Sequence, residues 1–298
     1  MTDLLQTLFS GVALGTKYSL VALGFVVIFR ATGVINFAQG GFVIVGAYLT
    51  YNFSVTWGFN FYLSVLLAMI CGAALGAFVE YLVLRRMVGE ASFSVIMLTI
   101  GLLFVIRALV PTVWGFANLQ QGDPWGIDTV ELGGVVFAVR ELWTIAAAAG
   151  ALLLFFLLFR YSKIGVAMRA VAIDQEAALA QGISVNRVVS VSWAIAGAVA
   201  TLAGVALSTG NAQLAPTIEY VALAAFPAMI LGGLDSPLGA VVGGLIIGIV
   251  QQLTGLYQPQ YAEWLGDGFS LVAPYVVMVI ILIVKPYGLF GTEEVRRA

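Results

Sequence analysis

Long apolar runs separated by short polar segments dominate the sequence. They lie at 10–29, 36–55, 61–84, 92–113, 142–159, 188–209, 220–233, 238–256 and 269–284. A membrane-spanning helix needs about 20 apolar residues to cross about 30 Å of hydrocarbon. The pattern predicts an all-α polytopic membrane protein with about nine transmembrane helices (eight to ten), some of them short or broken. We interpret the whole chain, residues 1–298, as a single transmembrane domain.

The seventh and eighth runs form one apolar block that is interrupted at 232–237. Pro237 suits the first position of a new helix, and Ser236 suits its N-cap. The block is either two crossings or a broken, re-entrant hairpin, because irregular backbone at membrane depth is tolerated only inside protein or beside a water-filled cavity. We interpret it as two crossings, since a hairpin would disturb the charge distribution described next.

Basic residues predict the orientation of the chain. With nine crossings, one side collects Arg30, Arg85, Arg86, Arg160, Lys163, Arg169, Arg187, Lys285, Arg296 and Arg297, and the other side collects Arg140. Basic residues concentrate on cytoplasmic loops, so the ten mark the cytoplasm. The N-terminus is therefore expected outside and the C-terminus inside. Five tryptophans fall near the outer face, as interfacial anchors do: Trp57, Trp114, Trp125, Trp143 and Trp264.

Two loops are long. Residues 114–141 form the extracytoplasmic loop, and residues 160–187 form the cytoplasmic one. The second predicts one amphipathic helix from about Ile164 to Gln181, ended by Gly182. Glycines also recur at a spacing of four, which lets helices approach closely in lipid. These pairs are Gly11/Gly15, Gly72/Gly76, Gly239/Gly243 and Gly244/Gly248.

Composition removes most chemistries. Hydrophobic residues make up 61% of the chain and charged residues 9%, with a net charge of −2, no histidine and one cysteine, Cys71. This excludes an internal disulfide and a histidine-dependent site, and it gives no sign of nucleic-acid binding or of a metal site. Lys17, Glu80 and Arg107 lie near span ends, where each is expected to reach the interface. No Gly-Lys pair exists to build a phosphate-binding loop. The chain therefore either passes solute passively or takes energy from a partner.

The cytoplasmic loop favours a partner. Glu176-Ala177-Ala178 followed by Gly182 resembles the Glu-Ala-Ala-x3-Gly signature of ABC importer permeases, although the Ile-x-Leu-Pro that continues the longer pattern is missing. The resemblance implies a coupling helix that docks on an ATPase. Its candidate residues are Arg169, Asp174, Glu176, Ala177, Ala178 and Gly182.

Other segments carry a closer resemblance. Residues 18–24, 30–40, 46–48, 231–240 and 285–291 are similar to high-affinity branched-chain amino acid ABC permeases, most specifically at 34–40 and 286–291. The resemblance implies a non-catalytic subunit of a bacterial inner-membrane importer, with no cofactor of its own. Its partners would be a second related permease, two cytoplasmic ATPases that bind ATP, and an extracytoplasmic solute-binding protein. Some family members move urea or short amides, so an importer of urea or short amides is one alternative. A passive channel for a small neutral solute is a second alternative.

Neutral polar residues in or beside the apolar runs are candidates for the solute pathway. Asn36 and Gln39 lead. Tyr48 is a weaker candidate that we keep with them, and the other weaker candidates are Asn211, Gln213, Gln251 and Gln252. A helix cap or an interhelical hydrogen bond is the alternative role for Asn36 and Gln39. Residues 33–40 also resemble 232–239, an echo which predicts that Asn36 lies beside Asp235.

Overall fold

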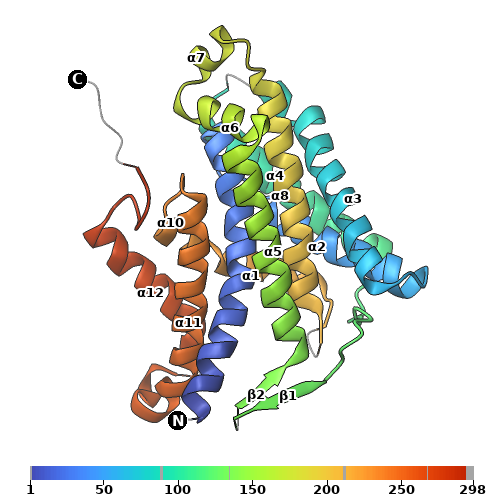
Figure 1. Cartoon of the computed structure of the whole chain (residues 1–298), viewed down its shortest axis with the longest axis vertical. Helices are drawn as coiled ribbons and strands as arrows, with labels where there is room; N and C mark the ends of the chain where they lie inside the picture. Colours follow the sequence, from blue (N-terminus) through green and yellow to red (C-terminus); the bar gives the residue numbers. More distant parts are fainter. Residues whose placement is uncertain (1, 88–89, 134, 211–212, 267, 293–298) are drawn as a thin grey trace.

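Six long helices form the body of the protein. The computed structural model describes residues 2–87, 90–133, 135–210, 213–266 and 268–292 (Figure 1). The six are α1 (Thr2–Thr32), α3 (Phe61–Leu82), α4 (Ser92–Trp114), α5 (Val139–Tyr161), α8 (Val185–Ser208) and α11 (Pro237–Tyr261). Each is long and apolar enough to cross a membrane, and α12 (Phe269–Val284) is a shorter apolar helix.

Two of the predicted spans consist of short pieces. Residues 36–55 form α2 (Gln39–Tyr51) and the start of a π-helical turn (Asn52–Thr56), and residues 220–233 fall mainly in α9 (Glu219–Ala224) and α10 (Phe226–Gly232). The break before α10 has a local cause, because Pro227 lacks the N–H that a continuous helix would require. Six helices meet the length of a full span in the described chain, so the predicted count of about nine is not confirmed.

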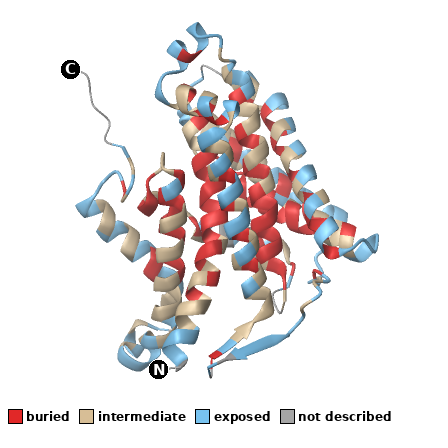
Figure 2. Ribbon diagram, viewed as in Figure 1, coloured by how far each residue is buried: buried red, intermediate tan, exposed pale blue. Residues whose placement is uncertain are grey.

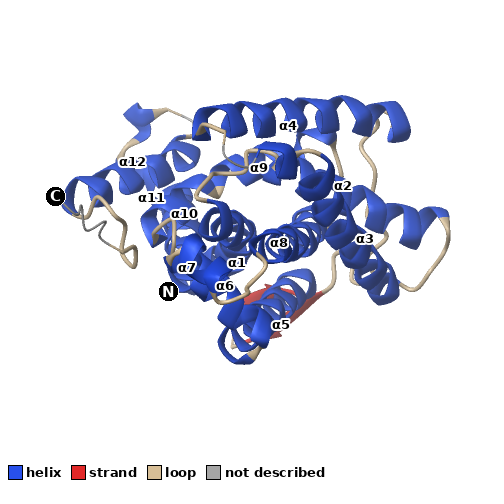
Figure 3. Ribbon diagram, turned by 90° about the horizontal axis from the view of Figure 1, so that it is seen from above, coloured by secondary structure: helices blue, strands red, loops and turns tan. Residues whose placement is uncertain are grey.

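α1 and α8 are the central helices. In the most apolar stretch of each, 78% of α1 and 67% of α8 is buried, whereas the values for α4 and α5 are 17% and 22%. Figure 2 shows the buried positions concentrated along α1 and α8, and Figure 3 shows α4 and α5 on opposite outer faces. The outer helices therefore present apolar side chains to their surroundings, as lipid-facing helices do.

The predicted glycine pairs lie at helix contacts. A Cβ at Gly15 would lie 2.7 Å from the Cα of Leu245 on α11, and one at Gly248 would lie 2.2 Å from the N of Gly15. A Cβ at Gly72 would lie 2.8 Å from the carbonyl oxygen of Gly197 on α8, and one at Gly243 would lie 2.1 Å from that of Ala228 on α10. No side chain fits at these positions, so the prediction of close helix packing is confirmed.

One end of the bundle carries α6 (Lys163–Ile173) and α7 (Gln175–Ala180), and we call it the α6–α7 end (Figure 1). The C-terminal segment joins this end, because Leu289 and Phe290 donate their N–H groups to the carbonyl oxygens of Leu231 and Gly232. The opposite end holds the start of α1 and an aromatic cluster. In this cluster the ring centroids of Trp125 and Trp143 lie 4.7 Å apart. Eight of the ten predicted cytoplasmic basic residues gather at the α6–α7 end: Arg30, Arg85, Arg86, Arg160, Lys163, Arg169, Arg187 and Lys285. Arg296 and Arg297 lie outside the described residues.

The structure corrects two local predictions. The fold is not purely α-helical, because the 114–141 loop contains an antiparallel hairpin of β1 (Thr129–Leu132) and β2 (Val135–Ala138). The single helix predicted over 164–181 is divided into α6 and α7. Asp174 is extended and its carboxylate accepts the N–H of Ala177, so it starts a new helix. The remaining short turns are Leu84–Met87, Pro216–Ile218 and Glu263–Leu265.

Candidate solute pathway and coupling surface

The segment between α1 and α2 turns back into the bundle. Gly33 ends α1 with a φ of +71°, a conformation that favours glycine. Phe37 then donates its N–H to Thr99 Oγ1 on α4 at 3.2 Å. The Gln39 side-chain amide donates to the carbonyl oxygen of Ala196, eleven residues into α8, at 3.3 Å. α2 therefore begins inside the bundle, beside the middle of α8.

A glycine makes room for this entry. A Cβ at Gly24 of α1 would lie 2.0 Å from Gln39 Nε2, so a side chain at this position would displace the amide. Gly24 is eight residues before the end of α1, which places the start of α2 roughly 12 Å inside the bundle at 1.5 Å per residue. The structure thus has a non-helical segment, residues 33–38, that returns into the core before α2 begins. Irregular backbone of this kind is common where membrane proteins bind solutes.

The candidates Asn36, Gln39 and Tyr48 each keep a buried polar atom without a partner among the described residues. Asn36, Gln39 and Tyr48 are 1%, 0% and 0% exposed, and Asn36 Nδ2, Gln39 Oε1 and Tyr48 OH have no hydrogen-bond partner among the described residues. Burying such a group without a partner costs about 1–3 kcal/mol. The other half of each amide has a structural bond, since Asn36 Oδ1 accepts the N–H of Ala38 at 3.0 Å and Gln39 Nε2 binds Ala196. One polar atom of each amide therefore makes a local or interhelical hydrogen bond, and the other polar atom has no partner among the described residues.

Two further residues with a buried polar atom of this type are not among the candidates that the sequence predicts. Gln121 Oε1 and Trp193 Nε1 are also buried without a partner in the described part of the chain. Trp193 is distinguishable in the sequence, because the other five tryptophans were assigned to the outer interface and this one lies inside the predicted 188–209 span. Gln121 lies in a glycine-containing loop and carries no such signal.

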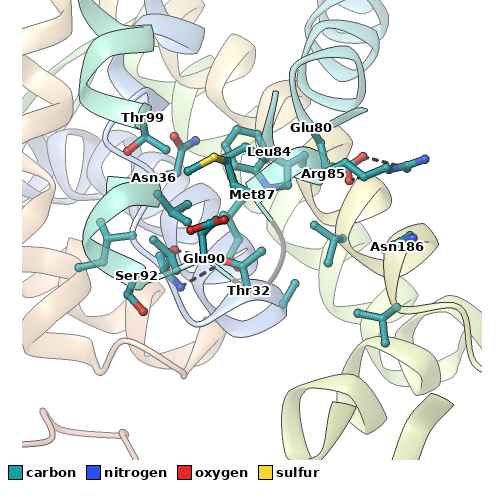
Figure 4. Close-up of a pocket in the computed structure, with 18 of the residues that line it drawn as sticks. Thr32, Asn36, Glu80, Leu84, Arg85, Met87, Glu90, Ser92, Thr99 and Asn186 are labelled. Carbon is teal, nitrogen blue, oxygen red and sulfur yellow. Dashed lines mark hydrogen bonds and ion pairs between the residues drawn. The ribbon is translucent and has the colours of Figure 1, made fainter. Parts of the chain in front are cut away.

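A cavity of about 200 Å³ lies at the α6–α7 end. Its walls come from α1, the segment before α2, α3, α4, α8 and Gln175 of α7. Figure 4 shows Asn36 and Thr99 together on one side, with Glu80 and Arg85 across from them. Trp193 also lines the cavity, whereas Gln39 and Tyr48 do not.

An ion pair borders this cavity. Glu80 is 2% exposed, and its carboxylate accepts from the Arg85 guanidinium at 3.2 Å and from the Ser190 hydroxyl. Arg85 also donates to Ser190 Oγ at 2.9 Å and lies over the ring of Tyr81. The expectation that Glu80 reaches the interface is wrong, because the network holds its carboxylate between α3 and α8.

The weaker candidates are scattered. Gln251 accepts a hydrogen bond of 2.8 Å from the Tyr18 hydroxyl. Gln213 is exposed, Gln252 is half-buried, and Asn211 lies outside the described residues. The Asp235 carboxylate accepts from Thr292, and its backbone oxygen accepts from Arg30. Asp235 therefore has different neighbours from Asn36, and the structure adds no support to the predicted pairing.

The predicted coupling residues divide into two groups. Asp174, Glu176 and Ala177 are exposed on or beside α7. Ala178 is 3% exposed and Arg169 donates to the carbonyl oxygen of Phe159, so both pack against their own chain. Gly182 has a φ of +79°, which confirms the predicted glycine turn.

Comparison with known proteins identifies the family. The family described as "Branched-chain amino acid transport system / permease component" matches residues 7–284. The permease protein LivH of Salmonella typhimurium is 28% identical over 98% of this chain and 97% of its own length. A probable LivH protein of Methanocaldococcus jannaschii is 29% identical over 92% and 88%. The fructose import permease protein FruF of Bifidobacterium longum is 24% identical over 95% and 79%.

A solved structure agrees at the level of the fold. PsaBC from Streptococcus pneumoniae, in complex with a Fab, gives a TM-score of 0.51 at 14% identity, and the match covers 96% of this chain and 93% of that one. This likeness shows a shared fold alone. The sequence comparisons go further, because the family match is continuous over nearly the whole chain. The chain belongs to the family of branched-chain amino acid transport system permease components.

Proposed function

We propose that this chain is the transmembrane permease subunit of an ABC importer. In this proposal it moves branched-chain or related amino acids that a solute-binding protein delivers, and partner ATPases drive the movement. The observation that carries the proposal is the family match over residues 7–284. A relative named LivM, 23% identical over 91% of this chain, supports a second related permease as a partner.

The geometry supports a neutral or zwitterionic solute. The buried polar atoms without a partner among the described residues are amide, phenol and indole groups, which bind without a net charge. The cavity wall carries the Glu80–Arg85 ion pair, whose charges balance, and the carboxylate of the exposed Glu90, and its described residues include no unbalanced cation. Such walls suit an amino acid with an aliphatic side chain and do not suit a polyanion.

The α6–α7 end supports coupling to an external ATPase. Asp174, Glu176 and Ala177 present an exposed, partly charged surface on a short helix that stands away from the bundle (Figure 1). In the proposal the chain forms a single permease domain in the inner membrane of a bacterial cell. The α6–α7 end faces the cytoplasm, and the N-terminus lies outside. The concentration of basic residues at the same end supports this orientation.

Purification and transport test the proposal together. A tagged chain, isolated in mild detergent from cells that express its neighbouring subunits, should bring down ATPases and a second permease. Reconstituted with the binding protein, the complex should take up leucine, isoleucine or valine only when ATP is supplied on the ATPase side. Uptake without ATP would instead indicate a passive channel. ATP-driven uptake of urea or fructose, but of no amino acid, would contradict the substrate class.

A further inference from the structure

The outward face of α5 is apolar over most of its length. α5 lies at the edge of the bundle in Figure 3, and its exposed residues recur at the spacing of a single helix face. Leu142, Leu153, Leu154 and Leu157 belong to this face and are between 40% and 67% exposed. An exposed apolar face of this length marks contact either with lipid or with another protein. The residues that end the face at the α6–α7 end favour lipid.

A tyrosine and two cations end this apolar face. Arg160 and Tyr161 follow Leu157 by three and four residues, so both continue the same face of the helix. Lys163 begins α6 directly after the turn at the end of α5. The rise from Leu142 to Arg160 is roughly 27 Å at 1.5 Å per residue, close to the thickness of about 30 Å of the hydrocarbon layer. Arg160 therefore lies where hydrocarbon gives way to lipid headgroups.

The two positive charges at this place are not neutralised by the protein. Arg160 and Lys163 are exposed, and neither forms an ion pair with a carboxylate among the described residues. The Arg160 guanidinium lies 5.5 Å from the ring centroid of Tyr161, which is 72% exposed. At the end of α3, Arg85 also lies over a tyrosine ring, but there the Glu80 carboxylate balances its charge. The end of α5 therefore presents two accessible cations beside an apolar face.

We propose that the α5–α6 corner, formed by Leu157, Arg160, Tyr161 and Lys163, binds an anionic phospholipid of the leaflet on the α6–α7 side. Arg160 and Lys163 contact the headgroup phosphate, and the acyl chains pack along the apolar face of α5. Each basic residue near a membrane surface attracts anionic lipid by a factor of about five, and tyrosine is enriched at headgroup level. The site requires only that the chain spans a membrane, so it does not depend on the solute or on the ATPases of the proposed function.

Fluorescence quenching beside the corner measures which lipid occupies it. In a Cys71→Ser background, Leu157→Cys carries a fluorophore, and the full chain is reconstituted in phosphatidylcholine with an increasing fraction of a brominated lipid. Brominated phosphatidylglycerol should quench at a several-fold lower fraction than brominated phosphatidylcholine. Met97→Cys is the positional control, because Met97 is 44% exposed near the start of α4, which has no basic residue before Arg107. The two brominated lipids should quench alike at position 97.

Charge variants identify the residues that attract the lipid. Arg160→Gln and Lys163→Gln should each reduce the preference for phosphatidylglycerol at position 157 by up to about fivefold, and together they should abolish it. Arg160→Lys keeps the positive charge and should keep the preference. Arg187→Gln is the matched control, because Arg187 is exposed at the same end but begins the central helix α8. It should leave the preference unchanged.

Three results would overturn the lipid site. The first is equal quenching by the two brominated lipids at position 157, or a preference that survives the double change of Arg160 and Lys163. The second is loss of the preference when inorganic phosphate is added at constant ionic strength, which would indicate a site for a free anion. The third is failure of both lipids to quench at position 157 in the complex with the proposed ATPases, which would show that a protein covers the corner. A preference that persists with phosphate and in the complex supports the site.

Discussion

At the scale of single residues, rarity was the useful signal. Amide side chains are uncommon within apolar runs, and this, together with their position at the start of the second run, singles out Asn36 and Gln39. The structure places both inside the bundle, each with one polar atom that has no partner among the described residues. The sequence did not reveal which half of each amide would be used locally, because that depends on Ala38 and on the distant Ala196. Glu80 was misjudged for the same reason, since its partner Ser190 lies 110 residues away.

The Glu80 network makes an asymmetric stability prediction. Arg85→Gln leaves a carboxylate that is 2% exposed without its counter-charge, whereas Glu80→Gln leaves a guanidinium on a side chain that is 35% exposed. Removing one partner from a fully buried pair costs about 3–5 kcal/mol. Arg85 is partly exposed and Glu80 keeps its bond to Ser190, so we expect a smaller loss, about 1–3 kcal/mol, for Arg85→Gln. For Glu80→Gln we expect about 1 kcal/mol or less, because water screens the remaining arginine. Unfolding in detergent, followed by denaturant titration, measures both.

The double variant and a surface control complete this measurement. Glu80→Gln combined with Arg85→Gln should be more stable than Arg85→Gln alone, since no uncompensated carboxylate remains. Glu90 is exposed, and Glu90→Gln should change stability by less than about 0.5 kcal/mol. Equal losses for the two single changes would contradict the asymmetry expected from the unequal burial of Glu80 and Arg85.

At the scale of elements, apolar length predicted the long helices and failed at their interruptions. The run at 36–55 was interpreted as one span, but only α2 within it is α-helical, because the entry of Gln39 is fixed by space beside Gly24. The division between α6 and α7 was in principle visible, since Asp174 is a good N-cap three residues before Ala177. The hairpin of β1 and β2 was hidden by the assumption that a membrane protein of this composition is helical throughout.

Two glycine-to-alanine changes, one at the contact between α3 and α8 and one on α4, should affect stability differently. A Cβ at Gly76 would lie 2.2 Å from the carbonyl oxygen of Trp193, so Gly76→Ala forces the two helices apart. Overpacking of this kind costs about 1–3 kcal/mol. Gly101 on α4 has no atom within 4 Å of such a Cβ, so Gly101→Ala should leave stability unchanged or raise it by up to about 1 kcal/mol. Thermal unfolding of the two variants compares them directly, and destabilisation by Gly101→Ala to the same extent would contradict the packing argument.

The α7 surface gives a prediction about coupling. Ala178 is buried within its own chain, so a bulky residue there would test folding, and the exposed Ala177 is the better probe of a partner. We expect Ala177→Trp to keep normal membrane levels and to lose ATPase co-purification and uptake, whereas Ala177→Ser should keep all three. Gly182→Val should also lose ATPase co-purification and uptake, because β-branched residues resist the φ of +79° at this position.

Gly182→Asn is the matched control for the turn. Asparagine adopts positive φ more readily than other residues with a side chain, so this variant should retain association and uptake. Normal uptake with both Ala177→Trp and Gly182→Val would show that α6 and α7 only connect α5 to α8.

At the scale of the whole molecule, the predicted side of the basic residues and the packing of the helices indicate the same end of the bundle, and these two observations have different physical causes. The sequence predicts that ten basic residues share one side, and the structure places the eight described ones at the α6–α7 end. Helix packing brings α10, α11 and the C-terminal segment to that end through contacts such as Arg30 with Asp235. The positive-inside rule reflects insertion into a membrane rather than packing. Agreement between the two therefore supports a cytoplasmic α6–α7 end more strongly than either does alone.

Two exposed aspartates test this orientation. Asp128 precedes β1 at the end opposite to α6 and α7, and Asp174 lies between those two helices. In a Cys71→Ser background, Asp128→Cys should react in intact cells with a thiol reagent that cannot cross the membrane, and Asp174→Cys should react only after the cells are opened. Labelling of opened cells is the control that both cysteines are accessible. Reaction of position 174 but not 128 in intact cells would invert the topology and move the proposed ATPase surface to the outside. Because an ATPase fuelled from the cytoplasm cannot work there, that single result would also contradict the proposed coupling role of α7.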